Sequence, residues 1–479
     1  MDRRKFIKSA GVIAAGSAVA HNLSLGKEIL PGVFASEKKP NIIFILADDY
    51  GIGEAGCYGA DNYKTPNIDK LAQGGVRFTH AYTPSLCGPS RACILTGRYA
   101  FRTGGTNQDK VGKLKPADET IIAKILKSVG YATTMAGKWS QFPLEPSDWG
   151  FDEYLRFQGS GQYWNTQKKA RTYTVNGANT PLLDGEYLPD KMHNFVVDFI
   201  TRYKDDPFFV YYSLSHIHGD ILPTPESGSN SKDIYADNIT YMDKLIGKLV
   251  AEIDRLRLRE KTMIVFFGDN GTANKYSDRA TISGRRLVGA KGSLLEGGSL
   301  EPLIINWPGT TPAGKVSDAM IDSTDFVPTF AEIASAQLPK DKIIDGRSFT
   351  SQIRGEKKEA RDLVFIQLAT QWYVRDKGWK LNQEGKLFDM SKAPFEEILV
   401  GVDSKDPEAV AARKRLQAAL EQLNPAGGIL DDGDGTGRHA NKTKKKKKQT
   451  DPDDENSDED DDSERKAEKK NKKKKKGIE

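Results

Sequence analysis

Four oxygen-donating side chains come directly after two apolar runs in the sequence. Asp48 and Asp49 follow the run NIIFILA, and Asp269 and Asn270 follow the run TMIVFFG. Such runs are typical of strands buried in a parallel sheet, and open α/β sheets place their sites at the carboxyl ends of these strands. A single Asp-Asp pair after a strand more often caps a helix or forms a turn. Two such ends carrying only oxygen donors instead predict one site for a hard cation, calcium or magnesium rather than zinc.

Cys87 opens the segment CGPSRACILTGR. Proline suits the first turn of a helix, so Pro89 predicts that a helix begins just after Cys87. The free backbone N–H groups and the positive dipole end of that helix would then face residue 87, where an anion is favoured. An isolated cysteine at a helix start usually does no more than pack. That reading does not account for the whole ordered segment.

The segment resembles the signature C-x-P-S-R-x-x-x-L-T-G of the sulfatase family. In that family the cysteine is oxidised after synthesis to formylglycine, an aldehyde whose hydrate supplies the nucleophilic oxygen for cleavage of a sulfate ester. The resemblance implies that Cys87 is converted by a formylglycine-generating enzyme and acts as the nucleophile. It also implies that Cys87 completes a calcium site, with magnesium possible, together with the four side chains named above. Arg91 is expected to neutralise charge on the sulfuryl oxygens.

Two lysines and a histidine extend the resemblance. The letters GKW around Lys138 resemble the family's G-K-W-H motif, and GAKGSLLEGG around Lys291 resembles its G-x-K-x-x-x-x-E-G-G motif. Both lysines would bind the sulfate group. His218 follows the apolar run FFVYYSL and is similar to the strand-end histidine that contacts the leaving-group oxygen in sulfatases. His216 is expected to pack or to orient its neighbour.

Two positions depart from the family pattern. Ser140 stands where G-K-W-H has its histidine, and Leu300 stands where E-G-G-x-R-x-P has its arginine. A serine hydroxyl is not a general base near neutral pH. These departures concern turnover and substrate orientation, and they leave the expected nucleophile and metal ligands unchanged.

The sequence therefore predicts an exported sulfatase that hydrolyses an organic sulfate ester, either an aryl or a carbohydrate sulfate. One alternative is a phosphodiesterase or phosphonate monoester hydrolase on the same scaffold, which paired sulfate and phosphate diester assays would distinguish. The other is a noncatalytic protein that binds sulfated glycans and releases no sulfate.

The N-terminus carries a targeting signal. The letters DRRKFIK, with Arg3 and Arg4, resemble the twin-arginine export motif, and a short apolar stretch at 10–20 ends in an AVA cleavage-like site. This stretch is too short and too rich in Gly and Ser for a membrane-spanning helix. We expect residues 1–35 to be a signal and leader recognised by the twin-arginine export machinery, which predicts a periplasmic or extracellular location.

Charge and cysteine content narrow the class further. The chain has 71 Lys and Arg against 66 Asp and Glu, and the lysine-rich C-terminus carries part of the excess. The body is thus nearly neutral, and no nucleic acid partner is expected. Three cysteines, Cys57, Cys87 and Cys93, are too few for a disulfide scaffold.

Helical and strand-like segments alternate through the body. Helices are expected at 118–129, 189–203 and 233–258, each followed by a strand-like run. This alternation predicts an α/β fold, with a large mostly parallel sheet sandwiched by helices, as the catalytic domain at 36–360.

The pattern changes near residue 361. Short strand-like pieces at 363–366, 379–381 and 386–390, with a helix at 407–423, resemble the small antiparallel C-terminal α+β subdomain of sulfatases, here placed at 361–425. Residues 426–479 contain charge blocks and few apolar side chains, so they are predicted to form a disordered charged tail.

Overall fold

The computed structural model describes residues 39–139, 142–166, 170–219 and 221–439 of the chain. The chain divides into two units, residues 1–38 and 39–479. The predicted leader at 1–35, Ser140 and the chain beyond residue 439 lie outside the described residues. Within the described ranges, no helix combines the length and apolar character needed to cross a membrane.

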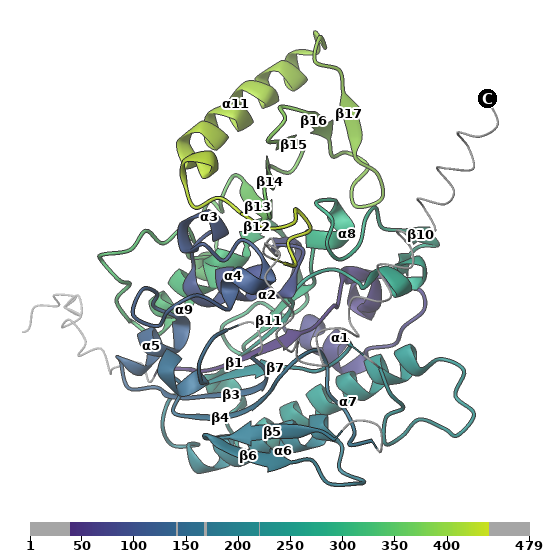
Figure 1. Ribbon diagram of the computed structural model, residues 1–479, viewed down its shortest axis with the longest axis vertical. Helices are drawn as coiled ribbons and strands as arrows, with labels where there is room; N and C mark the ends of the chain where they lie inside the picture. Colours follow the sequence, from purple (N-terminus) through teal and green to yellow (C-terminus); the bar gives the residue numbers. More distant parts are fainter. Residues whose placement is uncertain (1–38, 140–141, 167–169, 220, 440–479) are drawn as a thin grey trace, which may run out of the picture. The chain divides into compact units, whose positions relative to one another are not determined.

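A ten-stranded mixed sheet organises the second unit, with the strand order β12-β2-β11-β8-β1-β7-β3-β4-β5-β6 (Figure 1). The neighbours β8, β1, β7, β3 and β4 run parallel, whereas β11, β5 and β6 pair antiparallel with their neighbours. The strands are β1 Asn41–Ala47, β2 Val76–Tyr82, β3 Ala132–Lys138, β4 Glu153–Phe157, β5 Thr172–Val175, β6 Ala178–Pro181, β7 Phe208–Ser213, β8 Thr262–Gly268, β11 Leu303–Asn306 and β12 Lys315–Asp322. A separate hairpin pairs β9 Thr281–Ile282 with β10 Arg285–Arg286.

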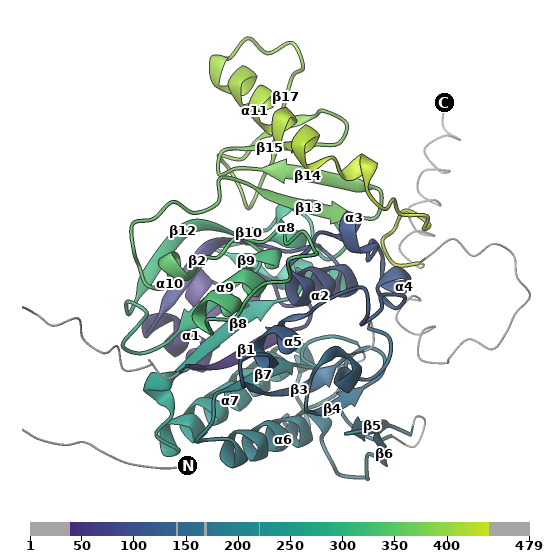
Figure 2. The same cartoon turned by 90° about the vertical axis from the view of Figure 1, so that its left-hand side faces the viewer.

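Helices cover both faces of this sheet (Figure 2). Strand side chains alternate between faces, so β1 separates two cores. Phe44 and Leu46 pack in one core with side chains of α2, α5 and α9. Ile43 and Ile45 pack in the other with side chains of α1, α6 and α7. The continuous apolar run of β1 is therefore explained by burial on both faces, and the predicted sandwiched α/β architecture is confirmed.

The helices are α1 Pro66–Gln73, α2 Cys87–Thr96, α3 Ala100–Thr103, α4 Gln108–Val111, α5 Ile122–Lys127, α6 Leu188–Arg202, α7 Ile234–Arg255, α8 Glu296–Ser299, α9 Phe326–Ile333, α10 Thr350–Ile353 and α11 Pro407–Leu423. Short 3-10 helices lie at Ile52–Glu54, Gly56–Tyr58, Pro146–Trp149, Arg259–Lys261, Asn274–Arg279, Ser323–Asp325 and Pro425–Gly427. The helix expected at 118–129 begins only at Ile122, because Lys115 C=O closes a turn on the N–H groups of Asp118 and Glu119.

A five-stranded antiparallel sheet follows, as predicted for the C-terminal part. Its strands, in order, are β13 Val364–Leu368, β14 Gln371–Arg375, β15 Trp379–Asn382, β16 Leu387–Asp389 and β17 Ile398–Val400. Helix α11 packs on this sheet through Ala412, Leu416 and Leu420, in a core shared with Tyr99 and Phe101 near α3. The sequence did not predict β14 or β17.

Candidate active site

The ends of β1 and β8 bring the predicted metal ligands together. The parallel register pairs Ala47 with Gly268, so the acidic residues that follow each strand lie side by side. The Asp49 backbone N–H donates to Asp269 Oδ1 at 3.1 Å, and Asn270 Nδ2 donates to Asp49 Oδ1 at 2.9 Å. Asp49 has a φ of 58°, a left-handed conformation that is uncommon for residues with a side chain and that Asp adopts more readily than most.

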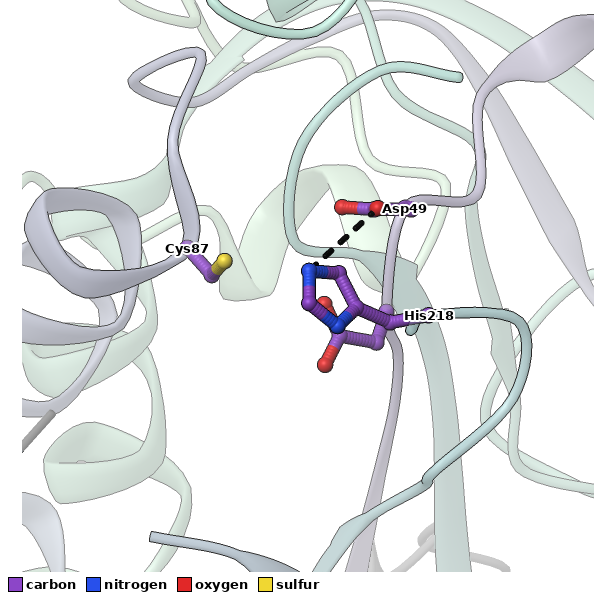
Figure 3. A group of neighbouring side chains, drawn as sticks. Asp49, Cys87 and His218 are labelled. Carbon is purple, nitrogen blue, oxygen red and sulfur yellow. Dashed lines mark ion pairs between the residues drawn. The ribbon is translucent and has the colours of Figure 1, made fainter. Parts of the chain in front are cut away.

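Cys87 faces this cluster from the start of α2. The helix begins at Cys87 itself, one position earlier than predicted, and the side chain is 1% exposed. Figure 3 shows Cys87 across from Asp49 and His218. Burial raises the pKa of the Cys87 thiol, although the charges of Lys138 and Lys291 oppose this. An unmodified thiol here stays protonated and is therefore a poor nucleophile.

Three buried cations surround the acids. Lys138 Nζ lies 2.8 Å from Asp48 Oδ2 and 3.4 Å from Cys87 Sγ. Lys291 Nζ lies 2.7 Å from Asp49 Oδ1. Arg91 donates through Nε to Asp269 Oδ2 at 2.9 Å, and its remaining nitrogens reach Asp48 and Ser213. The three cations that the sequence predicted therefore meet at one point with the nucleophile position.

Burial and neighbouring charges shift the pKa values of the carboxyl groups in this cluster. Burial disfavours the charged form of Asp48, but nearby cations, Lys138 first, hold the pKa of its carboxyl below its usual range. For Asp269, burial and then the charge of Asp48 raise the pKa to about 7. When all three carboxyl groups are ionised, their charge equals that of the three cations and leaves no surplus positive charge to hold an anion. A divalent cation added to this set would supply that surplus.

The donor set fits such a cation. Asp48 Oδ1 and Asn270 Oδ1 are buried and have no hydrogen-bond partner within the described part of the chain. Unpartnered buried oxygens are costly unless something coordinates them. Asp48, Asp49, Cys87 and His218 each offer a ligand atom, and these atoms all lie within 4.8 Å of one another. The carboxylates of Asp48 and Asp49 and the amide oxygen of Asn270 are the donors that suit calcium or magnesium, whereas the encoded thiol and imidazole are softer ligands.

His218 faces the acids from the loop after β7, as Figure 3 shows. Its Nε2 lies 3.6 Å from Asp49 Oδ2, and the Gly161 N–H donates to its Nδ1 at 3.3 Å. Burial lowers the pKa of His218 to about 3, so the ring is neutral. Because Nδ1 accepts a hydrogen bond, the proton is assigned to Nε2, the nitrogen that faces the site. His216 instead packs beside Tyr187, whose hydroxyl lies 3.1 Å from its Nε2.

Some neighbours of the site were missed from the sequence. Ser213 bonds Arg91, Gly161 holds His218, and Gln108 contacts the start of α2. Ser213 is the polar end of an apolar strand, which is a usable signal. Gly161 and Gln108 lie in polar loops that carry no periodic pattern, so only the tertiary structure identifies them. Ser140, the departure from the family motif, lies outside the described residues.

This site combines acidic residues at two strand ends, three buried cations and Cys87 at the start of a helix. On an α/β sheet covered by helices, such a set is typical of an enzyme that acts on a small anionic group. The chain matches the Sulfatase family model over residues 40–336 and the model N-sulphoglucosamine sulphohydrolase, C-terminal, over residues 291–424. The chain belongs to the sulfatase family, and it is a sulfatase, an enzyme that hydrolyses sulfate esters.

Individual relatives agree with this assignment. Arylsulfatase A of Homo sapiens is 30% identical over 463 residues, covering 82% of this chain and 90% of the relative. Steryl-sulfatase of Homo sapiens is 29% identical, covering 68% of this chain and 72% of the relative. Among solved structures, Ps i-CgsB in complex with k-i-k-neocarrahexaose is 28% identical with a TM-score of 0.69, covering 81% of this chain and 93% of that one.

Proposed function

We propose that this chain is an exported, calcium-binding sulfatase that carries formylglycine at position 87 and hydrolyses sulfated carbohydrates. The convergence of Lys138, Lys291 and His218 on Cys87 and the acidic pair is the observation that carries the proposal. The carbohydrate substrate is supported by the solved structure of Ps i-CgsB in complex with k-i-k-neocarrahexaose, which is 28% identical to this chain. Aryl sulfates are the smaller substrates for the same chemistry.

The encoded side chains divide the work of hydrolysis. Conversion of Cys87 would supply a hydroxyl nucleophile, and the calcium held by Asp48, Asp49, Asp269 and Asn270 would polarise the sulfuryl group. Lys138 and Lys291 bind sulfuryl oxygens and neutralise the charge that develops on them. Arg91 fixes Asp269 and Asp48 in place.

His218 completes the reaction. Its neutral ring carries a proton on Nε2 and can therefore donate a hydrogen bond to the oxygen of the departing alcohol. Over one turnover the S–O bond to the alcohol breaks, one water is consumed, and the products are the alcohol and inorganic sulfate with one proton released. The alcohol takes its proton from that water.

Export and modification belong to the same proposal. The predicted signal at 1–35 would send the chain through the twin-arginine route, which carries folded proteins, to the periplasm or the exterior. Changing Arg3 and Arg4 to Lys should then leave the protein in the cytoplasm. Export unchanged by that substitution would contradict the assigned route.

A sulfate-release screen across sulfated glycans and aryl sulfates tests the activity. The parent chain should release inorganic sulfate from at least one sulfated carbohydrate, and Cys87→Ala should release none while keeping the thermal unfolding midpoint. A phosphate diester of the same aryl alcohol serves as the competing substrate. Faster cleavage of the phosphate diester, or binding of sulfated glycans with no sulfate release, would overturn the proposal.

A further inference from the structure

Gln108, the first residue of α4, brings a neutral amide to the nucleophile position, in addition to the charged lysines. Its Oε1 accepts the Gly88 N–H at 2.8 Å, and its Nε2 lies 3.9 Å from Cys87 Sγ. A backbone N–H can only donate, so this bond fixes the amide with its two N–H donors toward residue 87. Gln108 is partly exposed, whereas Cys87 beside it is 1% exposed.

The segment of residues 428–439, here called the C-terminal segment, holds α4 in this position. Asp431 Oδ1 accepts hydrogen bonds from Thr106 Oγ1 at 2.8 Å and from Asn107 Nδ2 at 2.5 Å. The Gln108 N–H donates to Gly437 C=O at 3.1 Å, and Lys110 pairs with Asp432 at 2.8 Å. Every residue from 106 to 108 therefore bonds to the C-terminal segment.

The same segment packs against the residue before the nucleophile. Gly437 is buried and has a φ of 78°, a conformation that favours glycine. A Cβ at this position would lie 3.0 Å from Leu86 Cδ1 and 2.5 Å from Leu368 Cδ1. The segment thus reaches Leu86, the N-cap of α2, directly as well as through α4. The C-terminal segment falls within residues 426–479, which the sequence predicts to be a disordered tail. The residue at which disorder begins stays a prediction.

We propose that Gln108 is a further residue of the active site, whose amide N–H donates to an oxygen of the sulfuryl group or of the modified residue 87, and that Asp431 positions it through α4. This inference rests on the proposed function. It gives the site a neutral donor beside its charged lysines, and it makes the C-terminal segment part of the catalytic machinery.

Kinetics and sulfate binding together test the proposal. The variants are Gln108→Ala and Asp431→Ala in the full chain, with Gln417→Ala and Asp403→Ala, both exposed, as matched controls. Loss of a hydrogen bond to a charged group lowers the rate by about 10- to 100-fold, which is the expected fall in kcat/KM for Gln108→Ala. Asp431→Ala should lower kcat/KM by about 3- to 10-fold through misplacement. Calorimetry with inorganic sulfate should show at least about fivefold weaker binding for Gln108→Ala.

A double-mutant cycle separates positioning from general support of the fold. If Asp431 acts through Gln108, Asp431→Ala should cost nothing further in kcat/KM when Gln108 is already Ala. Asp431→Asn keeps an oxygen for the Thr106 hydroxyl and should recover part of the loss. Additive losses in the double variant, or wild-type kinetics and sulfate affinity for Gln108→Ala, would overturn the proposal.

The two arms also distinguish this inference from the proposed function. If the parent chain releases no sulfate from any ester, the proposed function fails, while the calorimetric comparison still tests the contact of Gln108 with sulfate. If the parent is active and Gln108→Ala matches it in both assays, only the present inference fails.

Discussion

The buried ion pair between Arg375 and Glu296 connects the small sheet to the segment that carries Lys291. Arg375 on β14 and Glu296 at the start of α8 are each 1% exposed, and Arg375 Nη1 donates to Glu296 Oε1 at 2.5 Å. The Tyr82 hydroxyl donates to the other carboxylate oxygen at 3.0 Å. Glu296 lies five residues after Lys291, so this pair anchors the segment that holds a proposed sulfate-binding lysine.

Arg375→Met removes the charge at similar side-chain size and leaves the Glu296 carboxylate buried with Tyr82 as its remaining side-chain donor. Removing one partner of a buried pair costs about 3–5 kcal/mol, a large share of the roughly 5–15 kcal/mol that stabilises a typical folded domain. The midpoint of urea unfolding should therefore fall steeply. The value of kcat/KM should fall with it, because Lys291 loses its support.

Two comparisons make this prediction sharp. Arg415→Met removes a surface partner of Asp376 with a side chain 54% exposed, and it should cost less than about 1 kcal/mol. The double variant Arg375→Met with Glu296→Gln removes both buried charges and should recover more than half of the loss. An Arg375→Met variant within about 1 kcal/mol of the parent, or a double variant no more stable than the single one, would refute the reasoning.

Three further predictions follow from the site and its surroundings. Chelation should abolish sulfate release and lower the unfolding temperature, and calcium at 100 times its Kd should restore about 2.7 kcal/mol of stability. Full activity after chelation, or stoichiometric zinc by elemental analysis, would contradict the assigned metal. His218→Ala should lower kcat by about 10²- to 10⁴-fold for sugar sulfates and less for aryl sulfates with acidic phenols, because a good leaving group depends less on that hydrogen bond; equal losses for both would remove His218 from that role. Burial and then Lys248 lower the pKa of His193 in the folded chain, so its protonation favours unfolding. Stability should therefore fall as pH drops below the unfolded pKa of about 6.5. In a pH series of urea unfolding, His193→Gln should lose less stability over that interval than the parent, and an identical pH profile would exclude the effect.

The sequence was a good guide wherever one strand or helix determines the chemistry. The apolar runs before Asp48 and Asp269 identified two strands, and parallel pairing places their ends together without further information. The helix at 407–423 was predicted at its observed bounds because Pro407 and the apolar spacing mark it clearly. Local pattern and global fold agree at these positions.

The rest of the site depends on contacts that no local pattern encodes. Gln108 lies beside Cys87, and the residue before it, Asn107, bonds Asp431, which is 324 residues away in the sequence. Strands β14 and β17 were missed because Gln371–Arg375 mixes polar and apolar side chains and Ile398–Val400 has only three residues. The tautomer of His218 likewise depends on a backbone N–H from Gly161, a residue in a polar loop.

Peptide mass spectrometry of Cys87 in an active preparation tests the central claim most directly. The account predicts that the peptide carries an aldehyde that reacts with a hydrazide, in proportion to the sulfate-releasing fraction of the protein, and that Cys87→Ala is inactive. Full sulfate release by a chain in which Cys87 is wholly an unmodified thiol would contradict it.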